Sequence, residues 1–503
     1  MRMNLRRFVI GLLAFLVIFW LFGKNKLLLL AGDDGGGGGG GGGGDDGEKR
    51  IIDEQPVETS VGYENIAVIE QEKRNNLRGS GRAYAPGAYM AGRRPGNHSF
   101  CKWYHGLPIN LEYRAEKIVS SPQARRRGGA SYRVLPYATR GWGWGWGYNS
   151  IYSEQQDERF HLARDLALCT HATADQVYHV VELATRWEGP ISLAVFAPGF
   201  DAGLAVTLLE RACRCEPQMA KVTVHLVFPV GRPPVLSPLV RRVSFGDCAA
   251  SDLQFKKSDT ERKKRGMRYP INVARNVARS LSPGKRVLVS DIELLPSERL
   301  ASGFLRMINT RRLPVPTDRT DLVFVVPIFE IDARERAPRN KTQLVAAVRN
   351  GLAVYFHRFV CIHCQRFPGI TRWMLRPDPG RVKPLILTRR EYPYHRWEPV
   401  FIGTKDDPMY NEDMSWEGRQ DKMLQMLEMC LMNYRLIILD GAFLVHTPGI
   451  KYKPSSPSSR MDMSNESHPA APASLEEIRN ARIYHNFTRR LLQKYPINRK
   501  CGQ

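Results

Sequence analysis

The stretch Arg286-Val-Leu-Val-Ser-Asp291-Ile-Glu293-Leu-Leu-Pro296 indicates the fold of this 503-residue chain. Residues 287–290 predict a short buried strand that ends in two carboxylates, Asp291 and Glu293. Such a strand is typical of an open α/β sheet, where ligands bind beyond the carboxyl ends of the strands. Carboxylate oxygens suit Mg²⁺ or Mn²⁺. Two solvated acids in a loop would give the same pattern, so the rest of the chain decides.

Predicted strands and helices alternate downstream of about residue 131. Strands are expected at 166–170, 191–197, 222–228, 287–290, 322–327 and 436–439. Helices are expected at 174–187, 201–213 and 269–281, and Asp201 is expected to cap the second of these. This alternation predicts an α/β fold with a mainly parallel sheet that is covered on both faces.

The N-terminal region predicts a membrane anchor. Residues 1–7, with three arginines, form an expected cytosolic tail, and an uncharged apolar run begins at Phe8. Lys24 and Lys26 can snorkel, so we expect a signal-anchor transmembrane helix over 8–31. A cleaved signal peptide is the alternative. Residues 32–130 are expected to form a Gly-rich linker and stem, and residues 131–503 the catalytic domain.

The formal net charge of +24 invites a nucleic-acid partner. The basic residues are scattered, however, and the sequence has no RNP, zinc-finger or helix-turn-helix signature. Attraction to anionic sugars, nucleotides or membrane surfaces explains the charge equally well. We therefore expect no nucleic-acid partner.

The nine cysteines and four glycosylation sequons fit a secretory-pathway protein. The odd number of cysteines leaves at least one outside any intramolecular disulfide. Cys361–Cys364 and Cys215–Cys248 are candidate disulfides. The sequons predict N-glycosylation at Asn97, Asn340, Asn465 and Asn486.

Polar motifs that can complete a site follow the acid pair. They are Trp397-Glu398-Pro399, Trp416-Glu-Gly-Arg-Gln-Asp421 and Phe443-Leu-Val-His446. Because neutral imidazole accepts Mn²⁺, His446 is a candidate third metal ligand beside Asp291 and Glu293. A structural histidine is the alternative.

Nine short motifs occur in order between Tyr132 and Cys501. They are Thr170-His-Ala-Thr, Arg186-Trp-Glu-Gly-Pro190, Tyr269-Pro-x-Asn-x-x-Arg275-Asn276, Asp291-Ile-Glu-Leu-Leu-Pro-Ser297, Val326-Pro-x-Phe-Glu330, Asn340-Lys341-x-x-Leu344, Cys361-x-x-Cys364, Trp397-Glu-Pro399 and Phe443-Leu-Val-His446. With this set the chain resembles the lumenal glycosyltransferases related to the beta-1,4-glucuronyltransferase of alpha-dystroglycan O-mannosyl glycans and, more distantly, to the second catalytic domain of LARGE. It departs from them at Glu293, where the usual Asp-x-Asp has a second Asp, and by one extra residue near Gln420.

The resemblance implies a GT-A fold, a Rossmann-like nucleotide-sugar domain with a divalent-metal site. It implies transfer of glucuronic acid from UDP-glucuronate, with inversion, to a terminal xylose of a glycoprotein O-glycan. Mn²⁺ or Mg²⁺ would be the cofactor, held by Asp291, Glu293 and His446. The implied location is the Golgi membrane with a lumenal catalytic domain, in association with other Golgi glycosyltransferases.

The resemblance also suggests roles for further residues. Asp421 is the expected base for the acceptor hydroxyl, with Glu412 and Asp413 as rivals. The remaining expected roles are uridine binding by Thr170 and His171, donor phosphate or carboxylate binding by Arg275 and Lys341, and acceptor binding by Trp397 and Glu398. Surface ion pairs (for Arg275 and Lys341) and plain core packing (for Trp397) are the alternatives.

Three other functions stay open. A related transferase with a different UDP-sugar is possible because few residues tune a sugar pocket. A catalytically weak, glycan-binding pseudo-transferase is motivated by Glu293, whose extra methylene can displace a metal by about 1 Å. A nucleic-acid binder is motivated by charge alone, and the expected lumenal topology argues against it.

Overall fold

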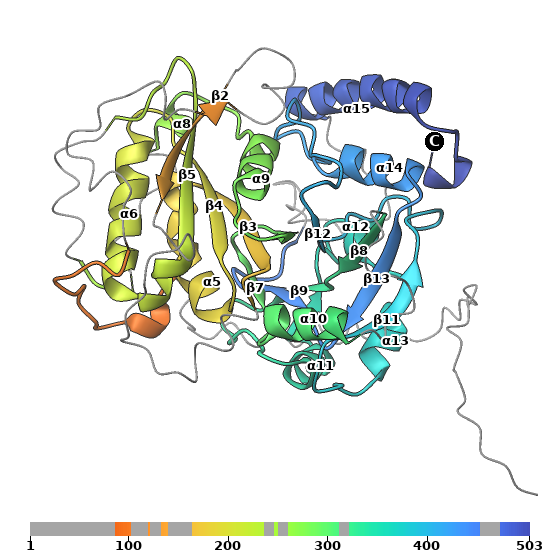
Figure 1. Ribbon diagram of the computed structural model, residues 1–503, viewed down its shortest axis with the longest axis horizontal. Coiled ribbons are helices and arrows are strands. Elements are labelled where there is room, and N and C mark those ends of the chain that lie inside the picture. Colours follow the sequence, from red (N-terminus) through yellow and green to blue (C-terminus); the bar gives the residue numbers. More distant parts are fainter. Residues whose placement is uncertain are drawn as a thin grey trace, which may run out of the picture. The chain divides into compact units, whose positions relative to one another are not determined.

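The computed structural model describes residues 86–101, 119–120, 132–138, 163–235, 246–249, 260–310, 321–452 and 473–502 (Figure 1). The expected tail, anchor and most of the stem lie outside these ranges, as does Asn465. Within them, no helix is both long and apolar enough to cross a membrane. All of these residues belong to one compact unit, 56–503.

The largest element is a ten-stranded sheet with the order β1-β2-β5-β4-β3-β6-β12-β8-β13-β11. Its strands are β1 Val119–Ser120, β2 Tyr132–Ala138, β3 Leu166–Thr173, β4 Ile191–Phe196, β5 Val222–Pro229, β6 Arg286–Val289, β8 Leu322–Val325, β11 Lys383–Thr388, β12 Phe401–Thr404 and β13 Arg435–Asp440. A second sheet has the order β10-β9-β14-β7, with β7 Leu294–Pro296, β9 Ile328–Ile331, β10 Ala353–Tyr355 and β14 Leu444–His446.

Helices cover the sheets. The α-helices are α5 Val180–Arg186, α6 Asp201–Cys215, α8 Glu261–Lys264, α9 Ile271–Ser280, α10 Leu300–Asn309, α11 Lys341–Arg349, α12 Ile362–Gln365, α13 Ile370–Leu375, α14 Met423–Leu431 and α15 Leu475–Lys494. Short 3-10 turns are η1 Ala88–Met90, η3 Ala174–His179, η4 Pro217–Lys221 and η6 Arg499–Cys501.

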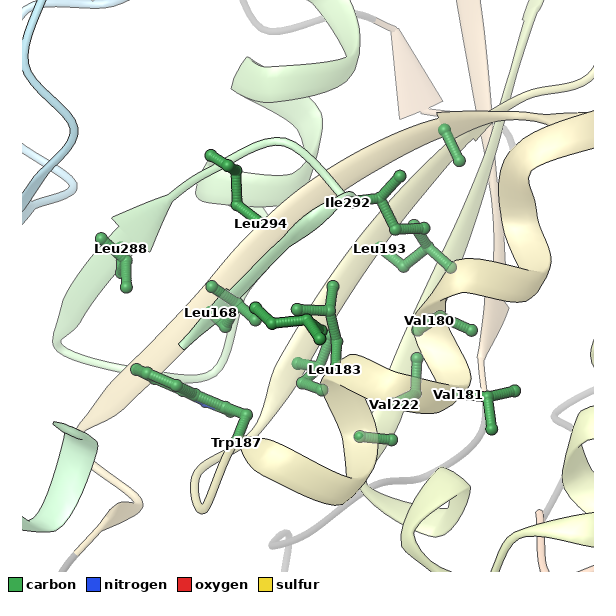
Figure 2. Close-up of a cluster of buried hydrophobic side chains, with 14 of the residues drawn as sticks. Leu168, Val180, Val181, Leu183, Trp187, Leu193, Val222, Leu288, Ile292 and Leu294 are labelled. Atoms are coloured by element: carbon green, nitrogen blue, oxygen red, sulfur yellow. The ribbon is translucent and has the colours of Figure 1, made fainter. Parts of the chain in front are cut away.

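One half of the large sheet, β5-β4-β3-β6, is parallel and buried on both faces. Alternate side chains point to opposite faces, as strand geometry requires. Leu168 and Leu193 pack with α5 and Trp187 on one face (Figure 2), and Ala167 and Ala194 pack with α9 on the other. The predicted strand–helix alternation is confirmed here.

The other half of the sheet is mixed, so the expectation of a mainly parallel sheet is confirmed only for β5-β4-β3-β6 and for the pair β8-β13. β12 runs antiparallel between β6 and β8, and β11 runs antiparallel to β13. β8 and β13 are parallel. The alternation of strands and helices in the sequence does not predict this reversal. After β8 the chain forms β9 and β10 of the second sheet before it re-enters the large sheet. The architecture is mixed α/β and consistent with a GT-A-like fold.

The acid pair lies where the chain passes from one sheet to the other. β6 ends at Val289 in the ten-stranded sheet, and β7 begins at Leu294 in the four-stranded sheet. Ile292 is 3% exposed and belongs to the same core cluster as Leu168 and Leu193 (Figure 2). Burial of Ile292 anchors the turn, and Asp291 and Glu293 start from either side of it.

Two other expectations concern local structure. The helix predicted over 174–187 forms as η3 followed by α5. Asp201 was expected to cap a helix through its side chain, which was wrong. It is the first residue of α6, and its carboxylate accepts hydrogen bonds from the backbone N–H groups of Glu261 at 2.7 Å and Arg262 at 3.0 Å. It therefore holds the start of α8.

Four disulfides cross-link the unit. The two predicted ones, Cys215–Cys248 and Cys361–Cys364, are confirmed. Cys101–Cys213 and Cys430–Cys501 are the others, and the second of these ties the C-terminal segment to α14. The ninth cysteine, Cys169, is buried in β3 as a free thiol.

Candidate active site

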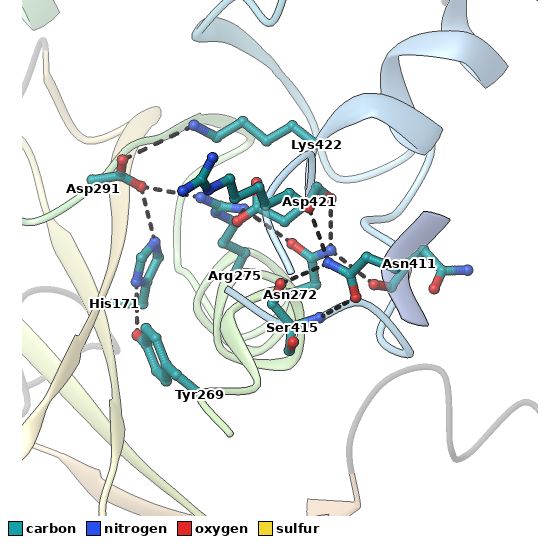
Figure 3. Close-up of polar contacts among 11 residues, drawn as sticks. His171, Tyr269, Asn272, Arg275, Asp291, Asn411, Ser415, Asp421 and Lys422 are labelled. Carbon is teal, nitrogen blue, oxygen red and sulfur yellow. Dashed lines mark hydrogen bonds and ion pairs between the residues drawn. The ribbon is translucent and has the colours of Figure 1, made fainter. Parts of the chain in front are cut away.

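Asp291 lies beside three cationic or hydrogen-bonding side chains (Figure 3). Its Oδ1 is 3.1 Å from Nε2 of His171 and 3.2 Å from Nη2 of Arg275. Its Oδ2 is 4.0 Å from Nζ of Lys422. Burial opposes a charge on Asp291, but Lys422, the His171 hydrogen bond and Arg275 hold the pKa of its carboxyl well below the usual range. Asp291 is therefore a carboxylate at neutral pH.

Strand register explains why His171 meets Asp291. β3 and β6 pair in parallel, with Cys169 opposite Val289, so two residues further on His171 is level with Asp291. Burial lowers the pKa of His171, so the ring is neutral. A carboxylate only accepts, so Nε2 carries the proton and donates to Asp291. Nδ1 then accepts from the hydroxyl of Tyr269 at 2.8 Å.

Arg275 on α9 links Asp291 to Asp421. Its Nη1 lies 3.0 Å from Oδ2 of Asp421, and its side chain is 3% exposed. Asn272, one turn earlier, accepts from Nη1 of Arg275 and donates to the carbonyls of Asn411 and Asp421 (Figure 3). Hydrogen bonds and an ion pair thus hold the loop that carries Asp421 against α9.

Glu293 belongs to a separate network on the second sheet. β14 pairs with β7 so that His446 lies opposite Leu294, the residue after Glu293. Nε2 of His446 is 3.2 Å from Oε2 of Glu293, and Nε2 of Gln176 is 3.4 Å from Oε1. Burial raises the pKa of Glu293, but the His446 hydrogen bond and charge outweigh it, so the pKa is lowered.

The proton positions on His446 bear on metal binding. Nδ1 is 2.8 Å from the carbonyl oxygen of Gly449, which only accepts, so Nδ1 carries a proton. In the neutral ring Nε2 then presents a lone pair to the Glu293 carboxylate. Two acceptors at 3.2 Å need a proton or a cation between them. A histidine whose other ring N–H donates a hydrogen bond to a backbone carbonyl is also the usual arrangement of a metal ligand.

Glu293 and His446 fit two positions of a divalent ion. Adjacent ligands of an octahedral ion at 2.0–2.1 Å lie about 3 Å apart. Asp291 has suitable oxygens, but its Oδ1 is engaged by His171 and Arg275. Among the residues that the structure describes, no group of three or more His, Cys, Asp or Glu side chains is arranged to hold a metal. The structure thus assembles two of the three predicted ligands.

Three predicted site residues are placed elsewhere. The ammonium of Lys341 is buried, 2.6 Å from Oδ1 of Asp440 and over the ring of Trp373. Trp397 is 1% exposed and packs in the core of the second half. Thr170 is buried in β3, one residue before His171, so strand alternation turns it to the opposite face.

The other predicted residues fall near the network. Glu412 accepts a hydrogen bond from Asn276 at 3.0 Å, and Asp413 is exposed in the same loop. Glu398 precedes β12 at the edge of the sheet that carries Asp291. The sequon residues Asn97, Asn340 and Asn486 are all exposed, as glycosylation would require.

The sequence interpretation missed Lys422, Tyr269 and Gln176 as site residues. Lys422 directly follows the nominated Asp421, and Tyr269 opens the motif that contains Arg275. Tyr269 stood inside a quoted motif and Lys422 directly after one, so their position was a usable signal. Nothing in the sequence distinguishes Gln176, which lies in η3.

Comparison with known proteins identifies similar chains. Residues 165–496 match the family model described as glycosyl-transferase for dystroglycan. The chain is 30% identical to Beta-1,4-glucuronyltransferase 1 of Danio rerio over 67% of its length and 75% of the relative, and 28% identical to the protein of that name from Homo sapiens over 67% and 78%. Xylosyl- and glucuronyltransferase LARGE1 of Danio rerio is 23% identical over 56% of this chain and 31% of the relative.

Proposed function

The chain belongs to the family of glycosyltransferases for dystroglycan, and we propose that it transfers glucuronic acid from UDP-glucuronate to a terminal xylose of a glycoprotein O-glycan. Its membership makes it a glycosyltransferase of the dystroglycan glycan pathway. The donor follows from the names of the relatives, beta-1,4-glucuronyltransferases among them. The acceptor follows from the resemblance in the sequence motifs.

The observation that carries the proposal is the turn Asp291-Ile292-Glu293 at the carboxyl end of β6. Ligands bind at such strand ends in open α/β sheets. The turn presents a carboxylate already paired with His446, and beside it the cationic groups of Arg275 and Lys422. Carboxylates coordinate divalent metals, and cationic side chains bind phosphate and carboxylate groups such as those of a nucleotide-glucuronate donor.

In the proposed reaction different side chains bind the metal, stabilise negative charge and accept a proton. Glu293 and His446, with Asp291, would hold Mn²⁺ or Mg²⁺. When bound, such an ion stabilises the negative charge of the departing diphosphate. Arg275 and Lys422 add fixed positive charge where water is largely excluded, which strengthens their effect on a developing anion. An inverting displacement also needs a carboxylate base for the acceptor hydroxyl.

We propose that the catalytic domain faces the Golgi lumen behind a type II signal anchor at 8–31. The four disulfides support an oxidising compartment, and the exposed sequon residues Asn97, Asn340 and Asn486 support passage through the secretory pathway. Digestion with a glycosidase specific for N-glycans should lower the apparent mass of the chain expressed in animal cells. An unchanged mass would count against a lumenal domain.

A donor panel tests the proposed activity. The purified full-length chain is incubated with Mn²⁺, a β-xyloside and, separately, UDP-glucuronate, UDP-xylose and UDP-GlcNAc. The proposal predicts turnover of UDP-glucuronate that is lost with EDTA and in Asp291→Ala. Turnover of another donor alone would replace the donor but keep the enzyme class. UDP binding without turnover of any sugar would favour a pseudo-transferase.

A further inference from the structure

Glu398 lies just before β12, at the edge of the sheet from which the acid pair emerges. β12 runs antiparallel to β6, with Ile402 opposite Leu288. Glu398 stands four residues before Ile402, and Lys422, Asp421 and Arg275, the groups around Asp291, act on its carboxylate electrostatically. The Val326 N–H donates to the Val400 carbonyl, so the segment just before β12 still follows the sheet. Glu398 therefore occupies the sheet edge where the proposed donor binds.

The backbone of Glu398 is held firmly at this edge. Its N–H donates to the carbonyl of Cys364 at 2.8 Å, and its carbonyl accepts from Nε2 of Gln365 at 2.7 Å. Both contacts come from the end of α12, which the Cys361–Cys364 disulfide constrains. The preceding residue, Trp397, is buried in the core. The direction in which the Glu398 side chain leaves the backbone is thus fixed.

The carboxylates of Glu398 and Asp421 differ in what they contact. Asp421 is clamped by Arg275 at 3.0 Å, so taking up a proton would weaken a buried ion pair. The Glu398 side chain is half-buried and receives no hydrogen bond from any residue that the structure describes. Lys422, Asp421, Arg390 and Arg275 all act on it electrostatically. Glu398 therefore has a free carboxylate in the neighbourhood of the site.

We propose that Glu398, in place of Asp421, is the base that accepts the proton of the acceptor hydroxyl. This inference rests on the proposed function. The acceptor oxygen forms a bond to the anomeric carbon as the bond from that carbon to the diphosphate breaks. UDP leaves with the bonding electrons, and the acceptor proton passes to the Glu398 carboxylate and then to solvent. Asp421 instead keeps Arg275 and its own loop in position.

The ionisation of Glu398 suits this role. Burial, the largest influence, raises its pKa from the ordinary 4.5 to about 7, and Lys422 opposes the shift. A base is most effective when its pKa is near the working pH. Activity should thus rise with pH, reach half of its maximum near pH 7 and level off above it. The folded state keeps a proton that the unfolded state releases above about pH 4.5, so stability falls as pH rises from there to about 7.

The test compares Glu398→Gln with Asp421→Asn and Glu391→Gln in the full-length chain. Glu391 is a matched control, a glutamate of the same connection that pairs only loosely with Arg389 at 3.8 Å and Lys500 at 4.0 Å. Glu398→Gln should lower kcat at least about 100-fold, with the acceptor KM near the wild-type value and the rise of activity with pH abolished. Glu391→Gln should match the wild type.

Thermal melting adds a readout that is independent of turnover. Relative to the wild type, Glu398→Gln should gain melting temperature as pH rises from 5 to 8, because it removes the ionisation that burial opposes. A raised acceptor KM with kcat and the pH profile preserved would make Glu398 an acceptor-binding residue and overturn the inference. Loss of the pH-dependent rise in Asp421→Asn but not in Glu398→Gln would restore Asp421. A wild type that turns over no UDP-sugar would overturn the proposed function, and this inference with it.

Discussion

Asp291 and Glu293 are separated by one residue, yet they belong to two different networks. Asp291 faces His171 from the ten-stranded sheet, and Glu293 faces His446 from the four-stranded sheet. The carboxylate–imidazole distances are nearly equal, 3.1 Å and 3.2 Å. What differs is the second nitrogen of each ring. That of His171 meets a hydroxyl, and that of His446 meets a backbone carbonyl.

This difference assigns the two halves different chemistry. The Tyr269 hydroxyl can donate, so neutral His171 satisfies Asp291 and Tyr269 together. The Gly449 carbonyl cannot donate, so the His446–Glu293 pair is satisfied only with a proton or a cation between its members. We infer that the Asp291 half is a wall in which Arg275 and Lys422 balance the carboxylates of Asp291 and Asp421, and that the Glu293 half is where a metal enters. The following variants separate the two halves.

The largest expected effect is on the Asp291 half. Arg275→Met should lower the free energy of unfolding by about 3–5 kcal/mol, because it leaves Asp291 and Asp421 without their shared guanidinium. Chemical denaturation of the variant and wild type measures this. The control is Arg334→Met at an exposed pair with Asp332, where a much smaller loss is expected because water screens the pair. Equal small losses in both variants would show that the Asp291 wall is not a structural unit.

Shortening the carboxylate tests the Glu293 half. In Glu293→Asp the oxygens retreat by one methylene from both His446 and Gln176. A displacement of about 1 Å at a reacting centre can cost of order 100-fold in rate, so kcat should fall by about that factor. The measurement is turnover at saturating Mn²⁺. Higher activity in this variant would mean that Glu293 is a poor substitute for aspartate.

The sequence predicted the fold correctly where apolar runs form buried parallel strands that alternate with helices. Buried strands with helices at regular spacing predicted the parallel half, and the strand before Asp291 was found within one residue of β6, Arg286–Val289. The reversal at β12 escaped prediction, because a four-residue strand containing Gly403 has no distinctive pattern. The second sheet escaped for the same reason, since β7 and β14 have three residues each.

The candidate site was predictable only where a local sequence pattern marks the residue. A histidine after an apolar run pointed to His446, and the structure brings it to Glu293. Lys341 in an Asn-Lys-Thr segment looked like a solvent-facing cation. Its partner Asp440 lies 99 residues away in the chain, and no local sequence pattern predicts such a pair. Sequence patterns could not place Glu398 either, because its position at the sheet edge depends on β12 pairing antiparallel with β6.

A smaller effect on folding stability, from Asp291, is expected only at acid pH. The pKa of Asp291 is depressed in the folded state, so its contribution to stability is present above the ordinary value of 3.8 and is lost as pH falls through the lower folded value. The stability difference between the wild type and Asp291→Asn should therefore shrink as pH falls below about 4. Urea midpoints at pH 7 and pH 3 measure it. A constant difference would contradict the depressed pKa.

The smallest effect concerns the His171 tautomer. Tyr269→Phe removes the hydroxyl that Nδ1 of His171 meets at 2.8 Å and leaves the ring in place. Loss of one buried hydrogen bond should cost about 0.5–1.5 kcal/mol of stability. Nitrogen NMR shifts of the imidazole report which nitrogen carries the proton. An unchanged tautomer population with unchanged stability would show that Tyr269 does not hold the ring.

The central claim is that the metal enters at the Glu293–His446 half. Titration of Mn²⁺ followed by electron paramagnetic resonance compares the wild type with His446→Ala and His171→Ala, the two histidines that face the acid pair. The account predicts that His446→Ala weakens Mn²⁺ binding by at least about 100-fold, because loss of a supporting contact alone costs 10–100-fold. His171→Ala should retain binding. Equal weakening in both variants, or loss in His171→Ala alone, would contradict it.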